Sequence, residues 1–159
     1  MIRYFLFLLF LQPCLITKTH SKTAITKLPG YAGDLPFKLE TGYVGTMEEE
    51  DIKLFYYFVE SARDPKEDPL IVHFRGGPGA SSLLGLINEI GPLTMNLDNL
   101  TFTLNPNTWT QFANIIFLDI PAGAGNERGD QPAVNVQVLN IAIEEWANME
   151  VVQQALGVR

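Results

Sequence analysis

The feature that most constrains how this chain can fold is a glycine-rich stretch set between two apolar runs, within residues 70–87. The first run, Leu70–Phe74, is short and follows an Asp-Pro pair, so it predicts a buried strand. The three glycines of Gly76–Gly79 cannot continue a strand or a helix, so the chain turns sharply there with its backbone bare. A serine that follows can cap a helix, which we expect over Ser82–Ile90. Backbone amides in such a place can hold an anion or an oxyanion.

Two alternating segments precede this region, at Glu40–Thr46 and Lys53–Glu60. Both are rich in aromatic and β-branched residues, and the acidic turn Glu48–Asp51 separates them, so they predict an antiparallel hairpin. A second apolar strand, Asn114–Ile120, follows the predicted helix. Strand, helix and strand in this order form a βαβ unit, whose parallel sheet is normally covered on both faces. The predicted fold class is therefore α/β, with an antiparallel hairpin leading into a parallel βαβ sheet.

The remaining segments are less regular. Residues 93–113 are expected to be a long loop with short extended pieces, and Ile143–Leu156 to form one amphipathic helix.

The N-terminus has the features of a secretory signal peptide. Met1–Ile16 places Arg3 before an apolar run that is too short to span a bilayer comfortably, although an uncleaved membrane anchor is the alternative. Cleavage near Ser21 would change the formal charge from −7 to −9. An acidic secreted chain disfavours nucleic acid and anionic membranes as partners. The sequon that begins at Asn99 agrees with secretion and makes Asn99 a candidate glycosylation site.

Nucleophilic catalysis would require a serine in a strained turn and a histidine to activate it. The best candidate is Ser81, but Leu83 stands where the Gly-x-Ser-x-Gly pattern needs its second glycine, so Ser81 is interpreted as a helix cap. The histidines are His20, in the signal region, and His73, in the predicted strand, so none follows a candidate serine. With one cysteine and two histidines in the chain, we predict no metal site and no cofactor.

A series of motifs nevertheless occurs in an order typical of one family. They are Leu28-Pro29-Gly30, Leu35-Pro36-Phe37, Glu40–Val44, Leu54–Phe58, Asp64–Pro69, Gly76–Gly79 with Ser81-Ser82, Glu89 with Gly91-Pro92, and Ile116–Asp119. Together they resemble the plant serine carboxypeptidase-like proteins of peptidase family S10, including the branch of glucose-ester-dependent acyltransferases. The resemblance covers Leu28 to about Gly125. It implies a partial α/β-hydrolase fold and secretion to the cell exterior or the vacuole. It also implies a peptide C-terminus or an acyl glucose ester as the molecule bound.

The resemblance also assigns roles to residues of the glycine loop. Gly77 would supply an oxyanion-hole amide, and Arg75 and Gly76 would contribute to substrate binding. The family's peptidases typically have Asn at the position of Arg75. A guanidinium there could pair with a carboxylate more strongly, but it would also fill the pocket. The family's cysteine after the loop is replaced by Ala80, so a family disulfide is expected to be absent.

The family's nucleophile elbow, triad acid and triad histidine have no counterpart in these 159 residues. We therefore divide the chain into a signal peptide (1–21), the N-terminal part of the hydrolase domain (22–125) and a divergent tail (126–159) whose helix resembles a downstream cap segment. This pattern predicts a truncated, catalytically inactive family member with an internal deletion. The alternative is a non-catalytic carboxylate-binding module or a decoy partner of an intact relative. In either case, strands that are central in the family would lie at a sheet edge.

Overall fold

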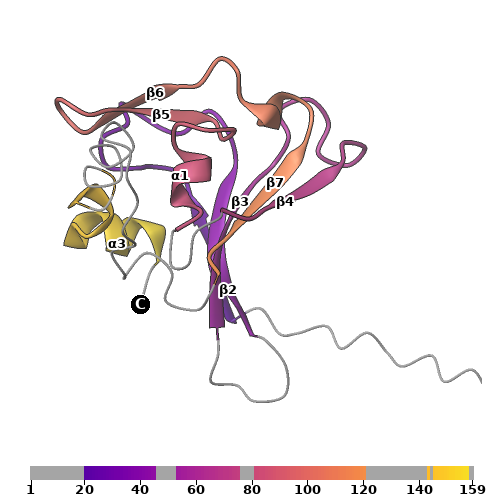
Figure 1. Cartoon of the computed structure of the whole chain (residues 1–159), viewed down its shortest axis with the longest axis horizontal. Helices are drawn as coiled ribbons and strands as arrows, with labels where there is room; N and C mark the ends of the chain where they lie inside the picture. Colours follow the sequence, from indigo (N-terminus) through magenta and orange to yellow (C-terminus); the bar gives the residue numbers. More distant parts are fainter. Residues whose placement is uncertain (1–19, 46–52, 76–80, 121–142, 144, 158–159) are drawn as a thin grey trace, which may run out of the picture.

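The computed structural model describes residues 20–45, 53–75, 81–120, 143 and 145–157. Its main element is a five-stranded sheet with the strand order β1-β2-β3-β7-β4 (Figure 1). The strands of this sheet are β1 (His20–Ile25), β2 (Leu39–Gly45), β3 (Lys53–Val59), β4 (Leu70–His73) and β7 (Asn114–Leu118). The other elements are α1 (Leu83–Leu86), β5 (Leu93–Asn96), β6 (Thr101–Leu104), the 3₁₀ helix η1 (Trp109–Gln111) and α3 (Glu150–Leu156).

The predicted antiparallel hairpin is confirmed. Strands β2 and β3 pair over their whole length, from Leu39 opposite Val59 to Gly45 opposite Lys53. The acidic turn predicted between them lies outside the described residues. Strand β1, which the sequence analysis does not predict, adds antiparallel to the free side of β2.

The predicted βαβ unit is also confirmed, because β4 and β7 are parallel, with Leu70 opposite Asn114 and His73 opposite Phe117. They form the only parallel pair in the described sheet, since β7 is antiparallel to β3 on its other side. In the described part of the chain β4 lies at one edge of the sheet and β1 at the other.

The helix between these strands is shorter than predicted. It ends at Leu86, and Ile87 is already extended and forms a parallel bridge with Leu93. Gly85 lowers helix propensity in the middle of this segment. Asn88 then adopts a left-handed conformation, with φ of 75°, and its side-chain oxygen accepts a hydrogen bond from the Met95 amide at 2.8 Å. These local interactions end the helix before the Gly-Pro pair that the sequence analysis takes as its stop.

The short extended pieces expected within residues 93–113 are β5 and β6, and they pair as an antiparallel hairpin that the sequence analysis does not predict. Their alternating side chains and Asn/Asp-rich turn are typical of such a hairpin. One other prediction needs correction. The helix predicted over Ile143–Leu156 is interrupted: residues 143 and 145–147 are helical, and α3 starts only at Glu150. Met149 has an extended backbone conformation at the break, with ψ of 131°.

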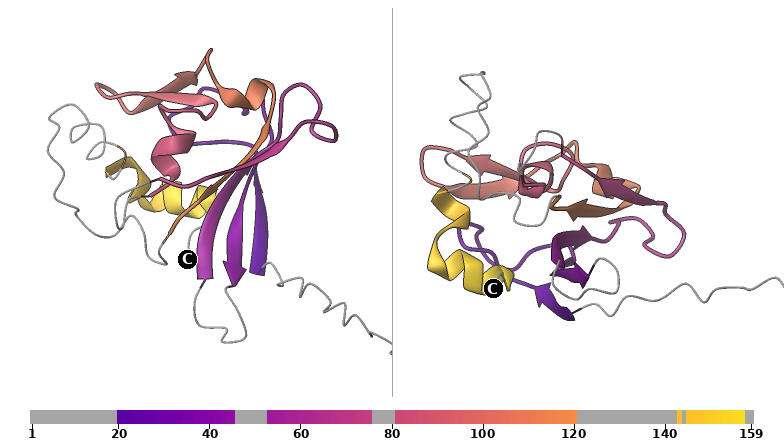
Figure 2. Two further views of the ribbon diagram at one scale, coloured as in Figure 1. Left: turned by 45° about the vertical axis from the view of Figure 1, so that its right-hand side comes forward. Right: turned by 60° about the horizontal axis from the view of Figure 1, so that its bottom comes forward.

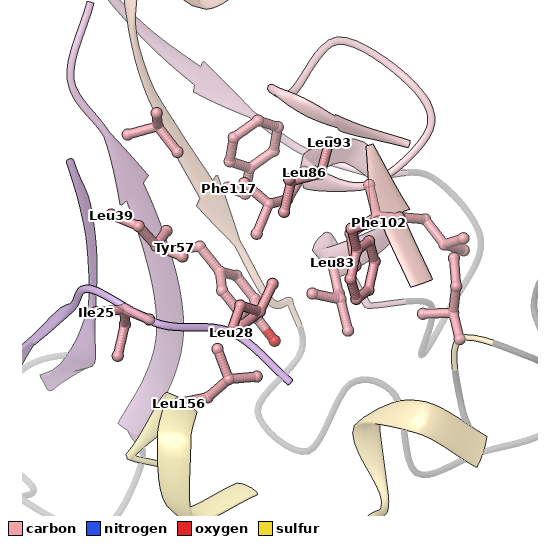
Figure 3. Close-up of a cluster of buried hydrophobic side chains, with 14 of the residues drawn as sticks. Ile25, Leu28, Leu39, Tyr57, Leu83, Leu86, Leu93, Phe102, Phe117 and Leu156 are labelled. Carbon is pink, nitrogen blue, oxygen red and sulfur yellow. The ribbon is translucent and has the colours of Figure 1, made fainter. Parts of the chain in front are cut away.

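One face of the sheet carries the hydrophobic core. Figures 1 and 2 show α1, α3 and the β5–β6 hairpin on the same side of the sheet. Figure 3 shows the side chains that meet between these layers. They include Ile25, Leu39, Tyr57 and Phe117 from the strands, Leu83 and Leu86 from α1, Phe102 from β6 and Leu156 from α3. Two polar contacts join distant parts of the chain: the Trp146 indole nitrogen donates to the Pro29 carbonyl at 3.0 Å, and the Thr41 hydroxyl donates to the Leu156 carbonyl at 2.5 Å.

Within the described residues, the opposite face of the sheet is uncovered, whereas the sequence predicts a sheet covered on both faces. A groove of about 700 Å³ runs across β2, β3, β7 and β4. Its apolar lining comes from the outward-alternating side chains of the strands, namely Val44, Tyr56, Phe58, Leu70, Val72, Ile116 and Leu118. Leu70 and Val72 are 58% and 44% exposed, so β4 is not the buried strand that its apolar sequence predicts. The continuous apolar sequence of β4 is typical of a strand covered on both faces. The described residues cover only the face that carries the core.

Candidate substrate-binding site

The candidate site lies where β4 ends and the glycine loop begins. Residues 76–80 lie outside the described part of the chain, so the roles of Gly76 and Gly77 stay predictions. Arg75, immediately before them, is described. One of its terminal nitrogens, Nη1, donates a hydrogen bond to the Glu89 carboxylate, and the two side chains form an ion pair. The Arg75 side chain is 19% exposed and the Glu89 side chain 39%, so the pair lies at the rim of the fold.

His73 lies two residues earlier on β4 and points toward the same carboxylate. Its Nε2 is 3.7 Å from a Glu89 oxygen, and its ring packs against Phe117 with the ring centroids 5.4 Å apart. A β-carbon added at Gly85 would lie 2.6 Å from the imidazole Cε1, so only glycine allows α1 to approach the ring this closely. His73 Nδ1 is buried and has no hydrogen-bond partner among the described residues. Among the described residues, His73 is therefore a packed side chain whose nearest charged neighbour is Glu89.

Ser81 does not face a histidine. Its hydroxyl donates to the Asp119 carboxylate, with oxygen–oxygen distances of 3.0 and 3.2 Å, and accepts a hydrogen bond from the Leu83 amide at 3.1 Å. Within the described residues, His73 makes no hydrogen bond to Ser81 or Asp119. The N-cap residue of α1 is Ser82, whose side chain makes no capping hydrogen bond, so the interpretation of Ser81 as the helix cap is wrong. Ser81 precedes the N-cap, and its oxygen accepts from the first amide of the helix.

Asp119 joins the end of β7 to the start of α1. Besides the Ser81 hydroxyl, its carboxylate accepts a hydrogen bond from the Ser82 amide at 2.6 Å, while the Ser82 hydroxyl donates to the Leu118 carbonyl at 2.6 Å. Burial raises the pKa of Asp119 to about 6, and the hydrogen bonds from Ser82 and Ser81 oppose this shift without cancelling it. The nearby Tyr57 phenol is buried too, and its burial, followed by the charge of Asp119, raises its pKa well above the usual value.

Sequence reasoning assigned no role to Glu89 or Asp119, although both occur in the motifs that carry the family resemblance. The signal for Asp119 was its place directly after a strongly apolar strand, where a polar side chain reaches the carboxyl end of a parallel sheet. The signal for Glu89 was weaker, because its contact with Arg75 depends on the short helix and the turn at Asn88.

The other predicted site residue is in a different part of the molecule. Asn99 lies in the exposed turn between β5 and β6, and its side-chain oxygen accepts hydrogen bonds from the Thr101 amide and hydroxyl at 3.2 and 2.6 Å. Its glycosylation stays a prediction. In the described ranges, no three metal-binding side chains come together, and no helix is long and apolar enough to cross a membrane.

Comparison with known proteins identifies the class of protein that this arrangement belongs to. The family model for serine carboxypeptidases matches residues 29–137. The chain therefore belongs to the serine carboxypeptidase family, as its motifs predict, and its fold is a partial α/β-hydrolase fold.

Individual relatives agree with this assignment. Serine carboxypeptidase-like 1 of Arabidopsis thaliana is 50% identical over 125 residues, which are 74% of this chain and 28% of that protein. Serine carboxypeptidase-like 3 of the same plant is 54% identical over 110 residues, which cover 66% of this chain and 25% of the relative. The chain thus spans about a quarter of the length of these relatives. Among solved structures, Kex1(delta)p, a prohormone-processing carboxypeptidase from Saccharomyces cerevisiae, matches with a TM-score of 0.48 and 20% identity over 77% of this chain and 29% of that one.

Proposed function

We propose that the 159-residue polypeptide carries the substrate-binding side of a serine carboxypeptidase-like site and does not itself turn over peptides or glucose esters. The observation that carries this proposal is the environment of Ser81. Its hydroxyl is engaged by a carboxylate and an amide, and the imidazole of His73 faces Glu89 instead. A serine hydroxyl is a weak nucleophile unless an adjacent base takes its proton. The Asp119 carboxylate is also held by the Ser82 amide, and among the described residues no imidazole reaches Ser81.

The test is a turnover assay with the purified 159-residue polypeptide. We expect no product above the protein-free blank from an N-blocked dipeptide or from benzoyl glucose, and Ser81→Ala should behave identically. Turnover that rises with protein concentration and disappears in Ser81→Ala would contradict the proposal.

A second function, non-catalytic binding of a carboxylate, is favoured by the position of Arg75. This side chain lies at the carboxyl end of a parallel strand, beside the glycine loop, where α/β folds commonly bind ligands. A guanidinium can bind a carboxylate through two parallel hydrogen bonds, and the C-terminus of a peptide is such a carboxylate. Holding such a group without cleaving it would make the chain a binding module or a decoy.

We expect Arg75→Ala to abolish binding of N-acetyl-alanyl-phenylalanine, because it removes the charge that would face the ligand carboxylate. Isothermal titration calorimetry measures this directly. Lys53→Ala is a suitable control, since it removes a cation of equal charge at the exposed start of β3. The methyl ester of the dipeptide has no free carboxylate, so we expect it to bind neither the parent nor Lys53→Ala. Equal binding by the parent and Arg75→Ala would show that Arg75 is not the carboxylate site.

A further inference from the structure

We propose that the free edge of β4 binds a second copy of this chain, and that the two β4 strands pair antiparallel to join two sheets into one. In the described part of the chain β4 lies at one end of the five-stranded sheet, with β7 as its neighbour. This inference does not depend on the carboxylate binding proposed above, because it rests on the edge of the strand and not on the glycine loop.

The hydrogen bonds between β4 and β7 determine which backbone groups of β4 remain available. The Pro69 carbonyl accepts a hydrogen bond from the Asn114 amide at 2.8 Å, so this carbonyl faces β7. Successive backbone groups of a strand point to opposite sides, so Leu70 and Val72 direct their amides and carbonyls away from β7. No described residue hydrogen-bonds to these four groups. Such a row of unpaired groups is a template for adding another strand.

The side chains of the same two residues suit an identical strand. Leu70 and Val72 lie on the open face of the sheet and are both exposed. In the antiparallel register that uses all four free groups, a two-fold axis passes beside Ile71, and Leu70 of each copy lies opposite Val72 of the other. Both cross-strand pairs are then apolar, and residues 69–74 contain no Asp, Glu, Lys or Arg that would repel an identical strand.

The charges that flank β4 agree with the antiparallel orientation. The exposed Glu67 precedes the strand, and Arg75 follows it. Antiparallel pairing therefore brings Glu67 of each copy toward Arg75 of the other, whereas parallel pairing would place like charges side by side. A second copy of the chain thus complements this edge in its hydrogen bonds, its apolar side chains and its charges.

The opposite end of the sheet is protected against the same association. Strand β1 has a register irregularity between His20 and Lys22, and the Lys22 side chain is 65% exposed. Bulges and lysine side chains are two means by which natural sheets block pairing between edges. Because β4 is the unprotected edge of the described sheet, the association stops at two copies, and the product is a closed dimer with two-fold symmetry.

Sedimentation equilibrium of the purified 159-residue polypeptide tests this inference. We expect a reversible increase in mass with concentration that ends at twice the 17.7 kDa of the chain. Val72→Pro removes an amide from the free edge but no hydrogen bond to β7, and Val72→Lys places like charges on the two strands. Each variant should keep the far-UV circular dichroism of a folded chain and weaken the dimer about ten-fold or more.

Val44→Lys is the matched control, because it introduces the same charge on the open face of the sheet but in β2, away from the free edge. It should leave the dissociation constant of the dimer unchanged. Hydrogen exchange of the parent gives a second readout that needs no variant. The amides of Leu70 and Val72 should exchange more slowly as the protein concentration rises, since they become hydrogen-bonded in the dimer.

Each outcome decides the proposal. A dimer that is lost in both Val72 variants and kept in Val44→Lys, with concentration-dependent protection of the two amides, would support it. Loss of the dimer in Val44→Lys would indicate that the open faces stack, and it would overturn pairing through β4. Dimers that persist in both Val72 variants would also overturn it, as would assemblies larger than two copies. A parent that stays monomeric up to about 0.1 mM, where a dimer of micromolar affinity would form, would overturn it as well.

Discussion

Replacing Phe117 by alanine is expected to remove most of the free energy of unfolding of the chain. Phe117 is completely buried on β7, where its ring packs against His73 and points into the core of Figure 3. Removing a buried phenylalanine side chain costs about 3–5 kcal/mol, through lost burial and the cavity that remains. The whole stability of a small domain is only about 5–15 kcal/mol, and this sheet is covered on one face in the described residues, which places it at the low end.

Circular dichroism and the fluorescence of Trp146, which is buried against Phe102 with the ring centroids 4.9 Å apart, would report this loss. Phe74→Ala is the matched control, because it makes the same change at a side chain that is 59% exposed and should leave both signals unchanged. A Phe117→Ala protein that keeps the spectrum and the melting temperature of the parent would show that the core is not organised around β7.

The second large effect is a dependence of stability on pH that originates at Asp119. Its pKa is raised from the ordinary 3.8 to about 6 in the folded chain, so the folded state binds more protons than the unfolded state between these values. The stabilisation from proton uptake is complete below about pH 4 and is lost as the pH rises through 6. The shift corresponds to about 2–3 kcal/mol between pH 4 and pH 7.

Urea unfolding of the parent and of Asp119→Asn at several pH values isolates this contribution, because asparagine mimics the neutral acid in shape but does not titrate. The difference in unfolding free energy between the two proteins should move by about 2–3 kcal/mol in favour of Asp119→Asn as the pH rises from 4 to 7. Asp98→Asn should follow the parent at every pH, since Asp98 is exposed. Parallel curves for the parent and Asp119→Asn would contradict the raised pKa.

The sequence was most informative where local pattern and tertiary environment agree. The β2–β3 hairpin and the parallel pair of β4 and β7 follow from alternating or continuous apolar runs bounded by turn residues. The short α1 could not be predicted, because its end depends on the Asn88–Met95 hydrogen bond and on contact between Gly85 and His73. The exposure of Leu70 and Val72 could not be predicted either, because an apolar run does not indicate whether both faces of its sheet are covered.

For the candidate site, the sequence identified Arg75 and the glycine loop, but it did not identify the carboxylates that contact Arg75 and Ser81. Glu89 and Asp119 reach Arg75 and Ser81 across sequence separations of 14 and 38 residues, so their roles arise only from the crossover between β4 and β7. The pKa and the interactions of a titratable group depend on neighbours that are distant in the sequence, and a local motif does not predict which residues these are. The family resemblance identified both positions without revealing that one carboxylate neutralises Arg75 and the other holds Ser81.

The most direct test of binding without catalysis is to incubate the 159-residue polypeptide with N-acetyl-alanyl-phenylalanine in ¹⁸O-water, at a concentration where calorimetry shows the dipeptide bound. Hydrolysis would break the alanyl–phenylalanine amide and leave one oxygen from water in the carboxylate of N-acetyl-alanine, which mass spectrometry detects at trace levels. We predict that the dipeptide is recovered intact, with no labelled N-acetyl-alanine above the protein-free sample. Labelled N-acetyl-alanine that accumulates with protein and is absent in Ser81→Ala would contradict this prediction.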